Sequence, residues 1–126
     1  MLAAGGAIAA LLATGCRNDG PPTASVTPEN GSGAITVVAE STSFSVERIE
    51  VQAGATTTIA LENRDAVAHM LTVYVAASPE GDIAADTGEV AGGERGEAVV
   101  FFAAPGEHAF RCEIHPDTMR GTLVVR

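Results

Sequence analysis

The sequence predicts an all-β fold, a sandwich of about seven short strands that occupies the chain from residue 34 onward. Three observations lead to this prediction. First, no window after Gly33 repeats apolar residues at helical spacing, as an amphipathic helix would. Second, short runs rich in Val, Ile, Thr and Phe alternate between apolar and polar residues. Third, clusters of Gly, Pro, Asn and Ser separate these runs at intervals typical of a sandwich.

The first half of this region contains four predicted strands. They are AITVVAE at 34–40, FSVERIEV at 44–51, TTTIALEN at 56–63 and HMLTVYV at 69–75. In the third strand, alternation points Ile59 and Leu61 inward and the residues beside them outward. The fourth strand alternates cleanly and places four residues on one face: His69, Leu71, Val73 and Val75. His69 is therefore expected at the start of a strand, on its apolar face.

The second half begins with a looser pattern. Residues 78–97 contain many Gly residues, so we expect a loop there with at most one short strand or helical turn. Three more strands follow, EAVVFFA at 97–103, HAFRCE at 108–113 and TLVVR at 122–126. The dipeptide Pro105–Gly106 supplies the turn between the first two of these strands.

The composition fits one small acidic domain. The chain has 126 residues and a formal net charge of −9, and all of its basic residues are Arg. A surface of this charge repels phosphates, so nucleic acid is excluded as a partner. Acidity suits a cationic protein partner, but it also keeps an exported domain soluble, and net charge alone does not choose between these roles.

Residues 1–16 form a predicted leader. Residues 2–14 are apolar or small throughout, and the stretch is shorter than the ~20 residues that a membrane-spanning helix needs, so it matches a secretory signal. It ends in LATGC at 12–16, which resembles the lipobox of bacterial lipoproteins, although Ala13 stands where Leu is usual. Cys16 is therefore a candidate for lipidation, and the alternative is an ordinary cleaved signal with an incidental Cys. Either interpretation predicts export, to the periplasm or the outer face of the cell membrane.

Between the leader and the domain, residues 17–33 read RNDGPPTASVTPENGSG. Pro, Gly, Ser, Thr and Asn dominate this stretch, and it has no apolar periodicity. Such a segment cannot bury enough apolar surface to order itself. We therefore expect a flexible linker over 17–33 and the folded domain over 34–126.

The residues that carry chemistry lie in FRCEIHPDTMRGTLVV, at 110–125. Two residues separate Cys112 from His115, and three separate His115 from Met119. A strand end followed by a tight loop can curl these three side chains around one point. Thiolate, imidazole and thioether are ligand types that favour copper over hard cations. A blue-copper site needs a second imidazole, and His69, which follows the polar turn ENRDAVA, is the candidate.

From residue 34 to residue 126 the chain resembles the cupredoxins, particularly the plastocyanin and amicyanin group of small blue-copper proteins. The stretches FSVERIEVQAG, ENRDAVAH and APGEHAFRCEIHPDTMRGTLVV carry the resemblance. It implies a cupredoxin-like Greek-key β-sandwich that binds one mononuclear type 1 copper. It also implies that His69, Cys112 and His115 are the equatorial ligands and Met119 the axial ligand.

Two details depart from the best-known members of this group. The loop has three residues between His115 and Met119, whereas amicyanins have two and plastocyanins four. This intermediate length is expected to preserve ligation while changing the position of the axial Met and the reduction potential. Second, Met70 follows the first His, where the family usually has an Asn whose hydrogen bonds tie the ligand loops together. We expect this change to affect the rigidity of the site.

Four protein ligands leave no open position for a substrate, which favours the transfer of single electrons, and we expect no enzymatic activity. Multicopper oxidases and nitrite reductases share the fold but need more copper sites and more His residues than this chain has. The expected partners of this monomer are redox proteins, such as a c-type cytochrome or a membrane oxidase or reductase, reached through the outer edge of His115. Two alternatives stay open, a copper-binding or delivery module without redox function and a metal-free sandwich. His108 is expected to be structural or exposed.

Overall fold

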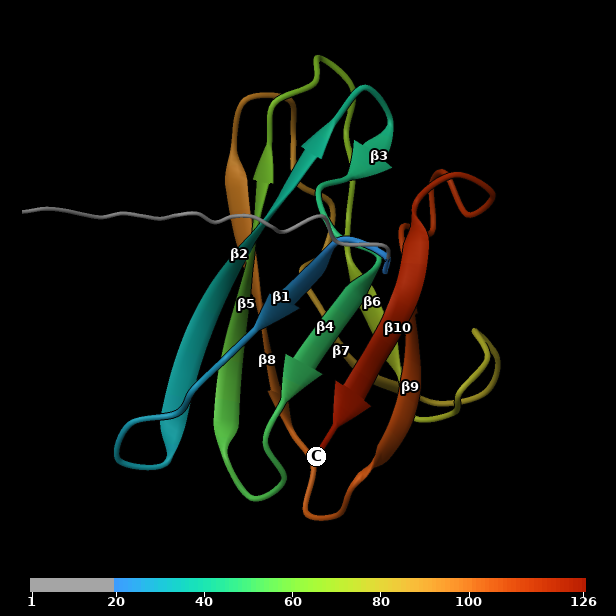
Figure 1. The fold of residues 1–126 in the computed structure, drawn as a ribbon. Coiled ribbons are helices and arrows are strands. Elements are labelled where there is room, and N and C mark those ends of the chain that lie inside the picture. The colour runs from blue at the N-terminus through green and yellow to red at the C-terminus, as the bar shows by residue number, and fades with distance from the viewer. Residues whose placement is uncertain (1–19) are drawn as a thin grey trace, which may run out of the picture.

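The computed structural model describes residues 20–126, and in this part of the chain every regular element is a strand (Figure 1). The strands are β1 (Thr23–Ser25), β2 (Ser32–Glu40), β3 (Ser43–Phe44), β4 (Arg48–Val51), β5 (Thr56–Asn63), β6 (Thr72–Tyr74), β7 (Ile83–Asp86), β8 (Arg95–Phe101), β9 (Gly106–Arg111) and β10 (Arg120–Val125). They form a six-stranded sheet in the order β1-β4-β10-β9-β6-β7 and a four-stranded sheet in the order β3-β2-β5-β8. The predicted all-β fold is confirmed. Among the described residues no helix is long and apolar enough to cross a membrane.

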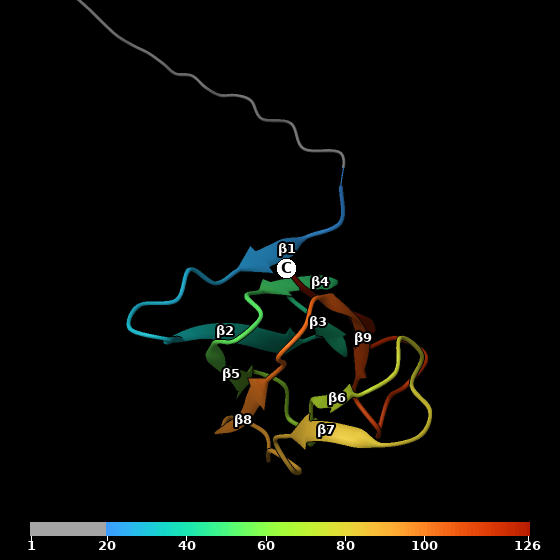
Figure 2. The same cartoon turned by 90° about the horizontal axis from the view of Figure 1, so that it is seen from below.

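The two sheets pack face to face around one apolar core (Figure 2). Because side chains alternate along each strand, one face of each sheet supplies this core and the other meets solvent. Ile59 and Leu61 of β5 point inward as predicted and are fully buried. The largest buried apolar side chains come from both sheets and from the loops at one end: Phe110, Ile49, Ile59, Leu61, Leu71, Met119 and Leu123.

Parallel and antiparallel pairs mix in both sheets, because the chain passes repeatedly from one sheet to the other, as in a Greek key. β2 pairs in parallel with β5, and β4 pairs in parallel with β10. The pairs β5–β8 and β9–β10 are antiparallel. As a result β2, β5 and β9 end, and β8 and β10 begin, at the same end of the sandwich, drawn at the top of Figure 1. The loops at this end carry the residues that the sequence marks as metal ligands.

The prediction of a flexible linker over 17–33, with the domain starting at residue 34, is wrong from Thr23 onward. Residues Thr23–Ser25 form β1, which pairs in parallel with β4 at the edge of the six-stranded sheet. Val26 is 6% exposed and belongs to the core, where it packs so closely on Gly33 that a Cβ there would lie 2.3 Å from its side chain. A single apolar residue gives no periodic pattern from which a strand could be predicted. The segment is ordered instead because its backbone forms hydrogen bonds with the free edge of β4. The leader at 1–16 lies outside the described residues.

The predicted strand at 44–51 is two strands in different sheets. β3 pairs with β2 in the four-stranded sheet, whereas β4 pairs with β10 and β1 in the six-stranded sheet. Alternation cannot reveal this crossing, because both sheets face the same core. The predicted strand at 69–75 is shorter than expected, since β6 covers only Thr72–Tyr74 and Val75 is 52% exposed. The loosely patterned region contains one short strand, β7, in agreement with the prediction.

Candidate metal centre

The loop between β9 and β10 closes on itself and brings Cys112, His115 and Met119 together. The backbone N–H of Cys112 donates to the carbonyl of Met119 at 2.8 Å, so the ends of the loop are joined. Inside the loop, the N–H of Met119 donates to the carbonyl of His115 at 3.1 Å. The eight-residue segment is therefore folded by its own backbone, as its residue spacing suggested.

A glycine lets this loop sit close to the rest of the sandwich. A Cβ at Gly121, the second residue of β10, would lie 2.3 Å from the carbonyl oxygen of Glu47 and 2.6 Å from the ring of Phe110. Neither neighbour can retreat easily, because one is backbone and the other is a fully buried ring that packs on Phe44 with 5.7 Å between centroids. Only glycine allows β10 to begin here.

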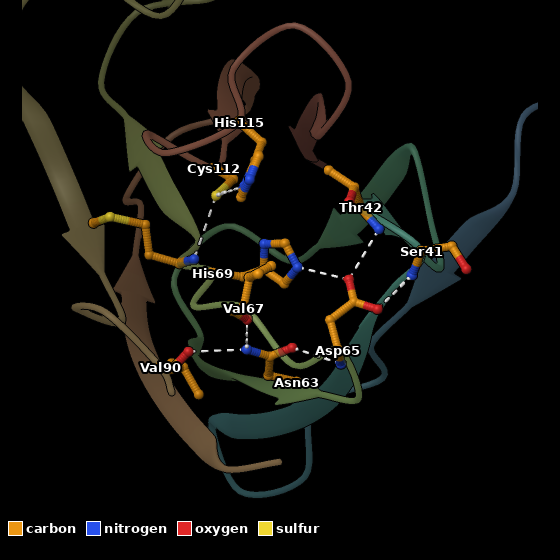
Figure 3. A network of polar contacts seen from close by, with 10 residues as sticks. Ser41, Thr42, Asn63, Asp65, Val67, His69, Val90, Cys112 and His115 are labelled. Carbon is orange, nitrogen blue, oxygen red and sulfur yellow. Dashed lines mark hydrogen bonds and ion pairs between the residues drawn. The ribbon is translucent and has the colours of Figure 1, made fainter. Parts of the chain in front are cut away.

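His69 lies at the same place but belongs to the segment between β5 and β6, where the chain crosses from the four-stranded to the six-stranded sheet. Its backbone exchanges two hydrogen bonds with Val90, at 3.1 and 2.7 Å, in an isolated bridge. His69 therefore does not open a regular strand, although it is fully buried together with Leu71 and Val73, with which it was predicted to share a face. Figure 3 shows its ring beside Cys112 and His115.

The three side chains form a compact cluster. One imidazole nitrogen each from His69 and His115 and the sulfur of Cys112 all lie within 4.8 Å of one another. The two rings stand edge to face, with centroids 4.8 Å apart and planes at 63°. Cys112 Sγ lies 3.9 Å from His115 Nδ1. Met119 is fully buried at the end of the same loop.

The donor set fits a copper ion. Nδ1 of His69 is buried and has no hydrogen-bond partner among the described residues, which is costly for a polar atom unless something else occupies its lone pair. The sulfur of Cys112 is buried as well and forms no disulfide. Two imidazoles and one thiol, with a thioether in the same loop, are the donors of a type 1 copper site. Hard cations such as Ca²⁺ prefer oxygen ligands instead.

Asn63 shapes the segment that carries His69. It is 1% exposed, and its side-chain amide donates to the carbonyls of Val67 and Val90 at 2.8 and 2.9 Å. Its Oδ1 accepts the backbone N–H of Asp65 at 2.9 Å. The amide group thereby connects the turn after β5 to Val90, the residue whose backbone pairs with that of His69 (Figure 3).

Asp65 contacts His69 directly. Its Oδ2 lies 2.7 Å from Nε2 of His69, and because a carboxylate only accepts, the ring nitrogen donates. The carboxylate also accepts the backbone N–H groups of Ser41 and Thr42, at 2.7 and 2.9 Å. The Thr42 amide, then the His69 ring, then the Ser41 amide lower the pKa of Asp65 to about 2. Asp65 is therefore negatively charged at neutral pH.

The residues on either side of Cys112 are also fixed. Arg111 donates to the carboxylate of Glu113 through Nη2 at 3.1 Å, and the hydroxyl of Tyr74 donates to the same carboxylate. The guanidinium of Arg111 lies 5.6 Å from the ring centre of Tyr74. Arg111 lowers the pKa of Glu113, and burial raises the pKa of Tyr74. These contacts anchor the point where the ligand loop leaves β9.

Sequence reasoning pointed to the four candidate ligands but assigned no role to Asn63 or Asp65, although both lie in the stretch ENRDAVAH. An Asp four residues before a His is informative on a helix, where the two share a face, but not in a loop of unknown shape. Met70 replaces the usual Asn, yet its backbone N–H donates to Cys112 Sγ at 3.4 Å, a contact that any residue except Pro can make. His108 stacks on Phe102 with 3.8 Å between ring centroids and lies outside the cluster, and Cys16 is not among the described residues.

The model of the cupredoxin-like domain family matches residues 6–125. The chain belongs to the cupredoxin-like family. Among solved structures this cupredoxin is similar to auracyanin A, a "blue" copper protein from the green thermophilic photosynthetic bacterium Chloroflexus aurantiacus. The two are 24% identical over 76% of this chain and 100% of that one, with a TM-score of 0.66.

Two further solved structures are similar to this chain. A reduced tyrosine-for-tryptophan mutant of amicyanin is 24% identical over 78% of this chain and 85% of that one, with a TM-score of 0.56. The metal-binding domain of a Cu(I)-exporting P-type ATPase from Streptococcus pneumoniae is 18% identical over 82% of this chain and 95% of that one, with a TM-score of 0.61. A comparison with curated protein sequences finds no significant match.

Proposed function

We propose that the protein is a type 1 copper protein that carries single electrons between redox partners outside the cytoplasm. In this proposal His69, Cys112, His115 and Met119 would together hold one copper. The observation that carries the proposal is the cluster of two imidazoles and one buried thiol within 4.8 Å, in which Nδ1 of His69 has no hydrogen-bond partner among the described residues. The bound copper would supply one-electron redox chemistry.

The surrounding residues favour a site that changes little when the electron arrives or leaves. Three of the four proposed ligands are fully buried in close-packed surroundings, which resist rearrangement: His69, Cys112 and Met119. The N–H of Met70 points at the Cys112 sulfur and stabilises negative charge on it. Four protein ligands would leave a bound copper no open position, which supports electron transfer over chemistry on a bound substrate.

His115 is the proposed route for the electron. It is half-buried, whereas the other proposed ligands are fully buried, so its ring lies nearest to solvent. The loops that supply ligands also expose two apolar side chains, Val67 at 52% and Ile114 at 40%. A small apolar surface of this kind suits a brief contact with a redox protein, such as a c-type cytochrome or a membrane oxidase or reductase. The net charge of −9 is compatible with a cationic partner for this proposed monomer, and it equally keeps an exported domain soluble.

The proposed location rests on the sequence alone. Residues 1–16 would direct export to the periplasm or the outer face of the membrane, and lipidation of Cys16 would hold the domain there. Mass spectrometry of the protein from a bacterial membrane fraction tests this proposal. A mature chain that begins at acylated Cys16 supports it, and an unmodified N-terminus contradicts the anchor.

A visible spectrum of the copper-loaded domain tests the main proposal. Adding one equivalent of Cu(II) to the apo-protein should produce the intense thiolate-to-copper band of a blue site, and reduction should bleach it. The fold is shared with a copper-exporting ATPase domain, so a copper delivery module is the second candidate. That function predicts a colourless, exchangeable complex, and such a result would contradict electron transfer.

A further inference from the structure

The turn between β2 and β3 has an unusual backbone. Ser41 and Thr42 form its two central positions, and both adopt left-handed φ angles, 55° and 54°. Two-residue turns of this kind normally use Asn-Gly, because a Cβ is disfavoured at positive φ, and a β-branched Thr is an outlier there. An interaction from outside the turn must therefore favour this conformation.

Asp65 provides that interaction from a distant part of the chain. Its two carboxylate oxygens accept the N–H groups of Ser41 and Thr42, which the left-handed turn aims in one direction. The carboxylate is thus held by backbone groups of the turn between β2 and β3. The backbone N–H of Asp65 in turn donates to Oδ1 of Asn63. Its side chain is 17% exposed, so it is largely shielded from water.

The carboxylate held in this way orients His69. Nε2–H of the ring donates to Asp65 Oδ2 at 2.7 Å, and the opposite nitrogen, Nδ1, is the buried atom without a partner in the described part of the chain. The contact selects the tautomer in which Nδ1 carries a free lone pair. Figure 3 shows the chain of contacts from the turn through Asp65 to the ring beside Cys112.

We propose that Asp65 is a positioning residue of the metal centre: it fixes the tautomer and orientation of His69, and its negative charge favours Cu(II) over Cu(I). The proposal rests on the proposed copper site and extends it. A unit charge separated from the metal by one imidazole acts at short range in partly dry surroundings, where screening by water is weak. It stabilises the dication more than the monocation and therefore lowers the reduction potential.

Asp65→Asn tests the charge at nearly constant shape. The blue band should remain, while the affinity for Cu(II) relative to Cu(I) should fall about 10-fold or more, within the range for loss of a hydrogen-bond partner of a metal ligand. A tenfold change raises the potential of a one-electron couple by about 59 mV. Glu40→Gln is the matched control, because exposed Glu40 adjoins the same turn and has the same charge. Potentials that are equal in Asp65→Asn and wild type would overturn the proposal.

A second set of variants separates this role from support of the turn. Replacing Ser41→Asn and Thr42→Gly gives the turn residues that suit its backbone, so the turn no longer needs the carboxylate. Combined with Asp65→Asn, these changes should restore the thermal stability lost by the single variant and leave the potential high. A return of the potential to the wild-type value would show that Asp65 acts only through the turn, and would overturn the proposal.

The tautomer of His69 supplies a readout that needs no copper. In the apo-protein at alkaline pH, ¹⁵N NMR should show His69 with its proton on Nε2 in the wild type and a mixture of tautomers in Asp65→Ala, which lacks the acceptor. Identical spectra would contradict the positioning role. If the copper-loaded wild type lacks a blue band while the two apo spectra differ, the proposed function fails and the positioning role of Asp65 stands.

Discussion

The loop from Cys112 to Met119 and the segment from Asn63 to His69 bring side chains to the same site, but different interactions hold them. The first is closed by its own backbone, since the N–H of Cys112 donates to the carbonyl of Met119. The second is held by side chains. The Asn63 amide donates to the carbonyls of Val67 and Val90, and the Asp65 carboxylate accepts from the turn between β2 and β3. Residues close together in the sequence therefore set the conformation of the first segment, whereas contacts with distant parts of the chain set the conformation of the second.

The two segments should therefore respond differently to substitution. A change at Cys112 or His115 removes a proposed ligand but keeps the hydrogen bonds that close the loop, because the backbone makes them. A change at Asn63 leaves buried polar groups without partners and should therefore reduce the stability of the fold, whereas a change at Asp65 should also act on the metal centre.

The largest expected effect is that of Cys112→Ser. Loss of the thiolate should abolish the blue band and lower the affinity for Cu(II) by more than about 100-fold, the upper range for loss of an outer hydrogen-bond partner. Visible spectroscopy and copper titration measure both effects. Met119→Leu is the comparison within the same loop, and it should keep the band and raise the potential. A blue Cys112→Ser protein would show that the ligand set is wrong.

Asn63→Ala should act mainly on stability. It removes the donor to the Val67 carbonyl, one of the two donors to the Val90 carbonyl and the acceptor of the Asp65 N–H, so the free energy of unfolding should fall by about 1–3 kcal/mol. Denaturant unfolding of the apo-protein measures this loss. The neighbouring Arg64→Ala is the control, because its ion pair with Glu62 is exposed and its effect should stay below about 0.5 kcal/mol. Equal losses in the two variants would contradict the comparison.

The smallest effect is expected far from both segments, at Glu50. Hydrogen bonds from Arg126 and then from Arg48 lower the pKa of Glu50 from 4.5 to about 2. A lowered pKa means that the stabilisation is present above pH 4.5 and is lost as the pH falls toward about 2. Glu50→Gln should therefore reduce the decline in stability over this window and leave the copper spectrum unchanged. Thermal unfolding at several pH values checks the first expectation, and a shifted spectrum would contradict the second.

The same difference explains how much the sequence could predict. Most of the core strands follow from alternation, and Cys112 and His115 follow from their spacing. The break between β3 and β4 could not be seen, because both strands face one core. β1 was missed, because an edge strand in a polar segment needs only a partner with free backbone groups. Asp65 was missed, because its role depends on a turn more than twenty residues away in the chain.

The pairing of β1 has a consequence for the proposed anchor at Cys16, because it leaves fewer residues between that position and the folded domain. In a chain anchored at Cys16, only residues 17–22 separate the lipid from the first strand. Even fully extended, at about 3.3–3.6 Å per residue, that stretch reaches only about 22 Å. The carrier would then search for its partners by diffusing along the membrane surface, in two dimensions, so encounters would depend on the density of partners in that surface rather than on their concentration in the surrounding volume.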